Sequence, residues 1–291
     1  MIKVDEKTDI KRIPKPDWLK VRLPFGQKYS EVKDIVKSNK LNTVCEDARC
    51  PNIAECWGRG TATFMILGDI CTRSCGFCAV KTGLPTELDL FEPIRVANAV
   101  KKMNLKHVVI TSVNRDELHT GGAEIFAETI KQIRDKVPGC KVEILTPDFK
   151  GVEEALDIVV DANPDIFSHN VETVPSLHKI VRPQAKYERS LYVLDYMKRK
   201  GLIIKSGLML GIGEKNEEVL SVLKDLRRIL VDIITMGQYL QPTPKHLPID
   251  RFVTPDEFNW FKKECLDMGF KHVESGPLVR SSYHADEQTV C

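Results

Sequence analysis

Short apolar or β-branched runs alternate with longer amphipathic stretches from residue 61 onward, and this alternation predicts the core of the fold. Six short runs predict β-strands: Thr61–Leu67, His107–Ser112, Lys141–Leu145, Ile166–Asn170, Ile203–Met209 and Ile233–Tyr239. Six longer stretches predict helices: Pro93–Met103, Ala123–Val137, Val152–Asp161, Tyr187–Lys200, Glu217–Leu230 and Pro255–Met268. Strands that alternate with helices form parallel sheets with crossover connections. The pattern therefore predicts an α/β fold, an incomplete (β/α)6 barrel of the TIM type.

The chain divides into three parts on this interpretation. Residues 1–60 form an N-terminal extension, residues 61–275 the partial barrel and residues 276–291 a C-terminal segment. The polar residues that follow the strands are the first candidates for the active site, because the loops at the carboxyl ends of barrel strands build it.

Lysines and prolines dominate the first 40 residues. Pro14, Pro16 and Pro24 forbid a continuous helix there. We expect an extended arm that wraps the domain and is anchored by four apolar side chains, Trp18, Leu19, Val21 and Leu23. Its basic character is typical of a solvated tail or of a surface that receives an acidic protein partner.

Composition and charge narrow the class of protein. The net charge of +2 gives no electrostatic case for nucleic acid or an anionic membrane as a partner. No apolar run reaches the roughly 18 residues of a membrane span, and the first ten residues lack the apolar region of a leader peptide. We therefore expect a cytoplasmic protein. Nine cysteines in a reducing compartment indicate metal chemistry rather than disulfides.

The spacing of Cys71, Cys75 and Cys78 is C-x3-C-x2-C. A structural zinc usually takes four ligands, and a bacterial ferredoxin has a different spacing. Three thiolates on a four-iron cluster leave one iron free to bind a substrate or cofactor. With Phe77, the motif C-x3-C-x-Φ-C resembles that of the radical S-adenosylmethionine (SAM) enzymes. In that family the open iron binds SAM, and an electron from the cluster cleaves SAM to a 5′-deoxyadenosyl radical. The alternative is three buried structural cysteines.

A second group, Cys45, Cys50 and Cys56, has C-x4-C-x5-C spacing. Two separate three-cysteine groups within about 35 residues rarely arise for packing reasons, although cysteines of a redox-silent core are the alternative. Again a fourth ligand is missing, so it comes from elsewhere in the chain or from a small molecule. The serines of Arg280-Ser281-Ser282-Tyr283 offer a hydroxyl.

Polar residues at strand ends are the candidates for holding SAM. Asn170 and Glu172 follow the fourth predicted strand, and Arg182 presents a fork-shaped donor suited to a carboxylate. Asn114, after the second strand, is a further candidate. The segment Gly211 to Glu214 lacks the third glycine of a dinucleotide fingerprint, which argues against NAD.

Taken together, the two cysteine motifs, the R-S-S-Y motif and the segments T-S-V-N-R-D-E-L and H-N-V-E-T-V resemble the lipoyl synthase family nearly end to end. The resemblance implies insertion of two sulfur atoms, at C6 and C8 of an octanoyl chain on a lysine of a carrier domain, with one SAM consumed for each. It implies two [4Fe–4S] clusters. Cys71, Cys75 and Cys78 hold the SAM cluster. Cys45, Cys50, Cys56 and a serine hold an auxiliary cluster that donates sulfur. We assign this ligand to Ser282, and the adjacent Ser281 is the alternative.

The resemblance also implies partners. These are octanoylated carrier domains of 2-oxoacid dehydrogenase E2 subunits and of the glycine cleavage H protein, an electron donor such as flavodoxin or ferredoxin, and an iron–sulfur cluster carrier. Cys140, Cys265 and Cys291 match no motif. Two rival functions are another radical SAM sulfur-inserting enzyme, related to biotin synthase or to methylthiotransferases, and a non-catalytic iron–sulfur carrier.

Overall fold

An eight-stranded sheet forms the centre of this computed structural model, which describes residues 14–21, 26–48, 50–59 and 61–288. In sheet order the strands are β1 (Asn42–Thr43), β2 (Thr63–Ile66), β5 (His107–Ser112), β6 (Lys141–Leu145), β7 (Ile166–Ser168), β8 (Ile204–Leu210), β9 (Ile233–Gln238) and β10 (His272–Gly276). Every pair from β2 to β10 is parallel, and only β1 runs antiparallel. Within the described ranges β1 and β10 are the edges of the sheet, so the barrel is open.

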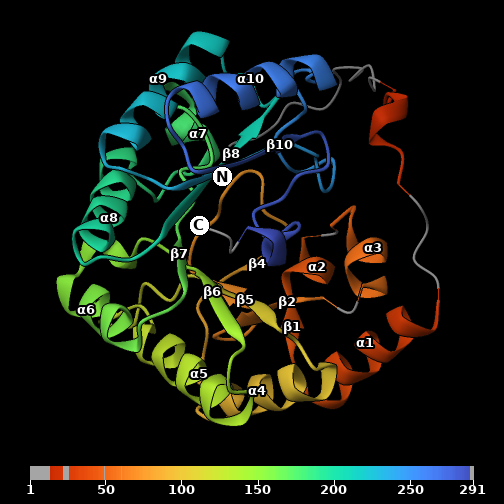
Figure 1. Cartoon of the computed structure of the whole chain (residues 1–291), viewed down its shortest axis with the longest axis vertical. Coiled ribbons are helices and arrows are strands. Elements are labelled where there is room, and N and C mark those ends of the chain that lie inside the picture. The colour runs from red at the N-terminus through yellow and green to blue at the C-terminus, as the bar shows by residue number, and fades with distance from the viewer. Residues whose placement is uncertain (1–13, 22–25, 49, 60, 289–291) are drawn as a thin grey trace.

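Helices surround this sheet on its outer face (Figure 1). The six long helices that follow the strands are α4 (Glu92–Met103), α5 (Ala123–Lys136), α6 (Glu153–Ala162), α8 (Tyr187–Arg199), α9 (Asn216–Arg228) and α10 (Pro255–Asp267). The other α-helices among the described residues are α1 (Gln27–Ser38), α2 (Val44–Asp47), α3 (Ile53–Gly58) and α7 (His178–Val181). The same part of the chain contains four short 3-10 helices: η1 (Asp17–Leu19), η2 (Phe149–Gly151), η3 (Pro175–Leu177) and η4 (Ala285–Glu287). None of the described helices is long and apolar enough to cross a membrane.

Burial on both faces explains why the strands read as continuous apolar runs. Phe64, Ile110 and Ile144 lie on neighbouring strands and are completely buried, because the helices cover the outer face and the barrel interior covers the other. Helix ends follow local rules. At α10 the Thr254 hydroxyl accepts the Glu257 N–H (3.2 Å), and the Glu257 carboxylate accepts the Thr254 N–H (3.0 Å), which is a reciprocal cap.

All six predicted strands and all six predicted helices are present, with ends shifted by a few residues at most. The predicted extended arm is wrong for Gln27–Ser38, which is helix α1. The prolines stop at residue 24, and Val32, Ile35 and Val36 then bury one helical face. Among the predicted anchors Leu19 is buried, whereas Trp18 and Val21 are 41% and 47% exposed; Leu23 lies outside the described residues.

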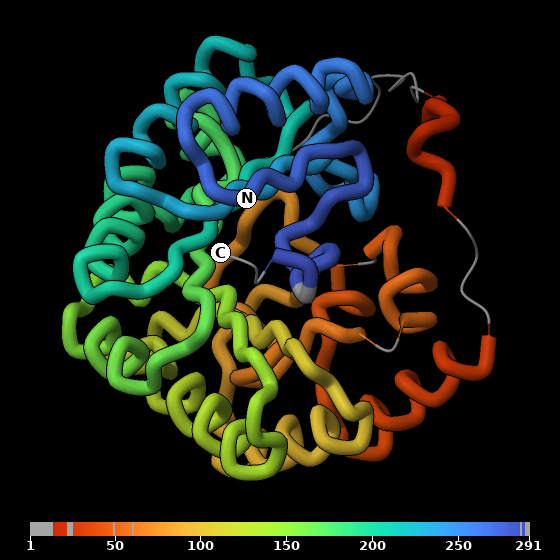
Figure 2. The backbone as a smooth tube through the Cα atoms, in the orientation of Figure 1, coloured from red at the N-terminus to blue at the C-terminus, as the bar shows by residue number. Residues whose placement is uncertain are grey.

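After β10 the chain turns back across the mouth of the barrel and reaches the N-terminal extension. Figure 2 shows this C-terminal segment, in blue, beside the orange segment that contains α2 and α3. The Asn52 amide donates to the Leu278 carbonyl (2.7 Å), and the Tyr283 hydroxyl donates to the Glu55 carboxylate (3.1 Å). The two extensions are therefore packed together on one side of the partial barrel.

Candidate active site

The loop of Cys71, Cys75 and Cys78 lies between β3 (Ile70–Cys71) and β4 (Lys81–Thr82), which pair with each other in a small separate sheet. The Cys71 sulfur accepts two backbone N–H groups, from Arg73 (3.4 Å) and from Asn114 (3.3 Å). The Cys78 N–H donates to the Cys75 carbonyl (3.1 Å), which folds the loop into a tight turn. Hydrogen bonds to sulfur stabilise a thiolate and tune the reduction potential of a cluster that it binds.

Burial holds two of these thiols in the neutral form. It raises the pKa of Cys75, and it raises the pKa of Cys78 to about 12. The other cysteines of the loop and the Glu172 carboxylate raise both pKa values further, while the Arg182 guanidinium lowers that of Cys75. The thiols would have to lose their protons to bind iron, and a bound cation would stabilise the thiolates that burial and the Glu172 carboxylate disfavour.

Three of the predicted cofactor residues lie together beside this loop. The Asn170 amide donates to the Glu172 carboxylate (3.1 Å), and the Arg182 guanidinium donates to the carbonyls of Asn170 (3.0 Å) and Val171 (3.2 Å). The side-chain oxygens of Asn170 and Asn114 are buried without a hydrogen-bond partner. Buried polar atoms are normally satisfied, so these two oxygens fit a polar ligand such as SAM.

Phe77, the last predicted cofactor residue, belongs to a small apolar cluster. It packs against the cluster of Val181, Ile212 and Tyr239 beside the cysteine loop. This packing places an apolar cluster beside the cysteine loop.

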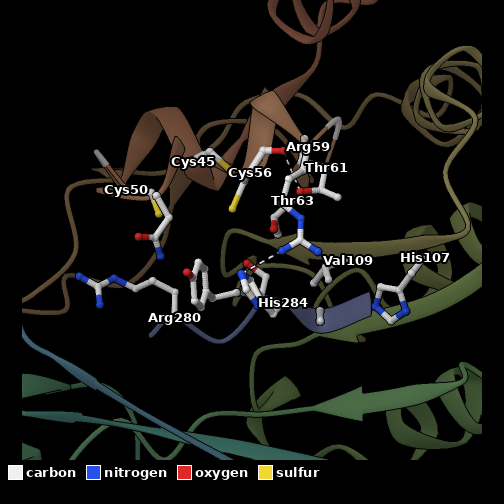
Figure 3. A pocket seen from close by; sticks show the side chains of 15 residues that line it. Cys45, Cys50, Cys56, Arg59, Thr61, Thr63, His107, Val109, Arg280 and His284 are labelled. Carbon is white, nitrogen blue, oxygen red and sulfur yellow. Dashed lines mark hydrogen bonds between the residues drawn. The ribbon is translucent and has the colours of Figure 1, made fainter. Parts of the chain in front are cut away.

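The second cysteine group lines a cavity that is partly open to solvent. In Figure 3, Cys45, Cys50 and Cys56 enter it from the α2–α3 region, and Arg280 and His284 enter it from the C-terminal segment. Ser282 also lines this cavity. Ser281 instead accepts a hydrogen bond from the Asn170 amide (2.7 Å), so the two adjacent serines reach two different sites.

The thiols of Cys45 and Cys56 are also in the neutral, protonated form. Burial raises the pKa of Cys45 to about 11 and that of Cys56 to about 12, and the neighbouring cysteines raise both further. Within the described residues no three His, Cys, Asp or Glu side chains are close enough to hold a single metal ion. In a cluster each thiolate binds a different iron, so cysteines arranged around a cavity suit a cluster better than one ion.

Sequence reasoning missed a polar network around the second site. The His284 ring contacts the Glu55 carboxylate (3.1 Å) and the Arg59 guanidinium (3.0 Å), and Arg59 also pairs with Glu287 (3.0 Å). Only residues far apart in the sequence make these contacts, so no local pattern signals them. Cys140 and Cys265 are buried and do not line the cavity, and Cys291 lies outside the described residues.

The fold and the first cysteine loop define a radical SAM protein. The model of the Radical SAM superfamily matches residues 65–226. Two solved structures share the fold. SuiB from Streptococcus suis bound to S-adenosylmethionine has a TM-score of 0.60 and 12% identity, and the match covers 78% of this chain and 54% of that chain. Methylornithine synthase (PylB) has a TM-score of 0.55 and 14% identity, and the match covers 89% of this chain and 88% of that chain.

A second family model and relatives that match nearly the whole chain define the family within that class. The model of the N-terminal domain of lipoyl synthase matches residues 2–50. The lipoyl synthase of Rubrobacter xylanophilus is 63% identical to this chain, and the match covers 94% of this chain and 86% of that protein. The lipoyl synthase of Flavobacterium psychrophilum is 57% identical, and the match covers 96% of this chain and 97% of that protein. The mitochondrial lipoyl synthase of Nematostella vectensis is 55% identical over 95% of each chain. The chain belongs to the lipoyl synthase family.

Proposed function

We propose that this enzyme inserts two sulfur atoms, at C6 and C8 of an octanoyl chain on a carrier lysine, and that the auxiliary site of Cys45, Cys50, Cys56 and Ser282 is their source. The observation that carries the proposal is the division of the R-S-S-Y motif. Ser281 bonds Asn170 beside the first cysteine loop, while Ser282 lines the cavity of the second cysteine group. One short segment thus connects the two sites that the reaction requires.

The first site would use Cys71, Cys75 and Cys78 to hold a [4Fe–4S] cluster whose remaining iron binds SAM. When bound, the cluster supplies the electron that starts radical chemistry. Such chemistry is needed because C6 and C8 of a saturated chain carry no acidic proton for a base to remove. The chain's own residues would orient SAM: Arg182 fixes the backbone at Asn170, and the unpartnered Asn170 and Asn114 oxygens would accept hydrogen bonds from the cofactor.

At the second site Cys45, Cys50, Cys56 and Ser282 would hold the auxiliary [4Fe–4S] cluster, which supplies sulfur when bound. A serine oxygen is a weaker partner for iron than a thiolate, so it leaves one corner of the site easier to open. The Tyr283 hydroxyl and His284 ring hold the segment against Glu55 and so keep Ser282 at the cavity.

The substrates are lipoyl carrier proteins. We propose the octanoylated domains of 2-oxoacid dehydrogenase E2 subunits and of the glycine cleavage H protein as these carriers. Flavodoxin or ferredoxin would supply the electrons, and an iron–sulfur cluster carrier would restore the auxiliary site. Trp18 and the basic residues around it remain a candidate contact for such partners.

Two triple variants test the division of labour. Alanine at Cys71, Cys75 and Cys78 should abolish SAM cleavage. Alanine at Cys45, Cys50 and Cys56 should leave SAM cleavage measurable and abolish sulfur transfer to an octanoyl-lysine peptide. Mass spectrometry of the peptide measures this transfer. Lipoyl product from the second variant would show that the sulfur comes from another source.

A further inference from the structure

A buried arginine in the loop of the first cysteine group forms an ion-pair triad with two aspartates of other loops. Arg73 stands between Cys71 and Cys75, and its side chain is only 3% exposed. Its guanidinium donates to both oxygens of Asp116 (2.7 and 2.8 Å) and to one oxygen of Asp148 (2.6 Å). The bidentate pair with Asp116 has the fork geometry that fixes both position and orientation. Nothing in the proposed chemistry requires these charges.

The two aspartates come from two different strand-end loops. Asp116 follows β5, and Asp148 follows β6 and caps η2 by accepting the Lys150 N–H (3.1 Å). Asp148 is completely buried, and the Arg73 guanidinium holds its pKa well below the usual range. Arg73 therefore joins the cysteine loop to the loops that follow the next two strands.

Backbone contacts beside the triad continue to the cysteine sulfur. The Thr72 N–H donates to the Asn114 carbonyl (3.0 Å), and the Thr72 hydroxyl accepts the Asp116 N–H (3.1 Å). Asn114 in turn donates its N–H to the Cys71 sulfur. A movement of Arg73 relative to Asp116 would thus move Cys71 relative to Asn114, whose side-chain oxygen is one of the two unpartnered acceptors.

An ordinary surface ion pair on the same loop gives a contrast. Lys81 and Asp69 form one at 2.8 Å with 75% and 45% of their side chains exposed, and such pairs contribute little. Burying Arg73 and Asp148 costs desolvation that apolar packing would avoid. The planar Arg73 guanidinium, however, fixes its partners in one defined geometry.

Resting on the proposed function, we propose that Arg73 is a positioning residue. Clamped between Asp116 and Asp148, it fixes the loop of Cys71, Cys75 and Cys78 relative to the strand-end loops that hold SAM. It thereby sets how often cleavage of SAM is followed by removal of hydrogen from the octanoyl chain, rather than whether the loop can bind iron.

The test compares Arg73→Lys and Asp148→Asn with the unaltered protein, all loaded with clusters and reduced. Because a displacement of about 1 Å costs on the order of 100-fold in rate, we expect product formation to fall by about that factor. SAM cleavage should fall less, so the ratio of SAM cleaved to lipoyl product should rise. The electron paramagnetic resonance signal of the reduced cluster should also change less when SAM is added. Lysine keeps the charge of Arg73 but lacks the fork, so it should not restore the ratio.

Lys81→Gln is the matched control, because it removes an exposed ion pair from the same loop and should leave ratio and signal unchanged. Iron content and the thermal unfolding of the iron-free variants distinguish positioning from folding. An unchanged ratio with proportional losses of iron, signal and product would reduce Arg73 to a folding role and overturn the proposal. So would full activity of Arg73→Lys. If the unaltered protein makes no lipoyl product, the proposed function fails, and the response of the signal to SAM still tests Arg73.

Discussion

Two adjacent serines have different surroundings, and the difference gives each a separate role. Ser281 accepts a hydrogen bond from Asn170, next to the first cysteine loop, whereas Ser282 lines the cavity of the second cysteine group. Adjacent residues in an irregular segment point in different directions, so one motif serves both sites. The assignment of the fourth ligand to Ser282 remains a prediction, and this geometry supports it.

Replacing each serine should therefore have a different effect. Ser282→Ala should keep its iron, because three thiols remain, and should lose most sulfur insertion while SAM cleavage continues. Ser281→Ala should lose one hydrogen bond, of about 1 kcal/mol, and should weaken SAM binding through Asn170. SAM titrations and product analysis measure both effects. The reverse pattern would move the ligand to Ser281.

The thiols of the second site make the iron-free protein sensitive to high pH. Their folded pKa values, about 11 for Cys45 and about 12 for Cys56, lie above the ordinary value of 9.0. The unfolded chain therefore loses these protons first as the pH rises, and the free energy of unfolding should fall between pH 9 and 12. At about pH 7 and below, both thiols stay protonated in the folded and the unfolded chain, so they should contribute no pH dependence there. Urea unfolding at several pH values checks this, and a Cys45→Ala, Cys56→Ala variant should show a smaller fall.

Among the elements, the C-terminal segment depends on one glycine of β9. A Cβ atom at Gly237 would lie 2.0 Å from the carbonyl oxygen of Val279 and 3.2 Å from the Arg280 guanidinium. The segment that carries both serines therefore lies directly on the inner face of β9. Any side chain at Gly237 would push this segment away from the barrel.

Gly237→Ala should accordingly separate the two halves of the reaction. We expect a loss of stability of about 1–3 kcal/mol from overpacking and a much larger loss of sulfur insertion, because Ser282 leaves its cavity. SAM cleavage should be reduced less. Gly58→Ala is the control, since a Cβ there would meet open space. Equal losses of sulfur insertion in both variants would show that displacement of the segment is not the cause.

At the scale of the whole molecule, the alternation of buried strands and amphipathic helices was predictable because each element carries its own periodicity. The short helices α2 and α3 were not, since helices of four and six residues have no periodic signal and depend on tertiary packing. The two cysteine groups were visible as spacings. The triad of Arg73, Asp116 and Asp148 was not, because its members lie up to 75 residues apart and meet only once the sheet has formed.

On the proposed function, the protein supplies both sulfur atoms from its own auxiliary site. If the auxiliary site is the source, the product sulfur should come from sulfide that is already bound beside Cys45, Cys50 and Cys56. The most direct measurement loads the protein with isotopically heavy sulfide and then supplies only light sulfur, SAM, reductant and octanoyl-lysine peptide. Mass spectrometry should find two heavy sulfur atoms in the lipoyl product and no more than about one product per chain. Many turnovers that place light sulfur in the product would show that the sulfur does not come from the auxiliary site.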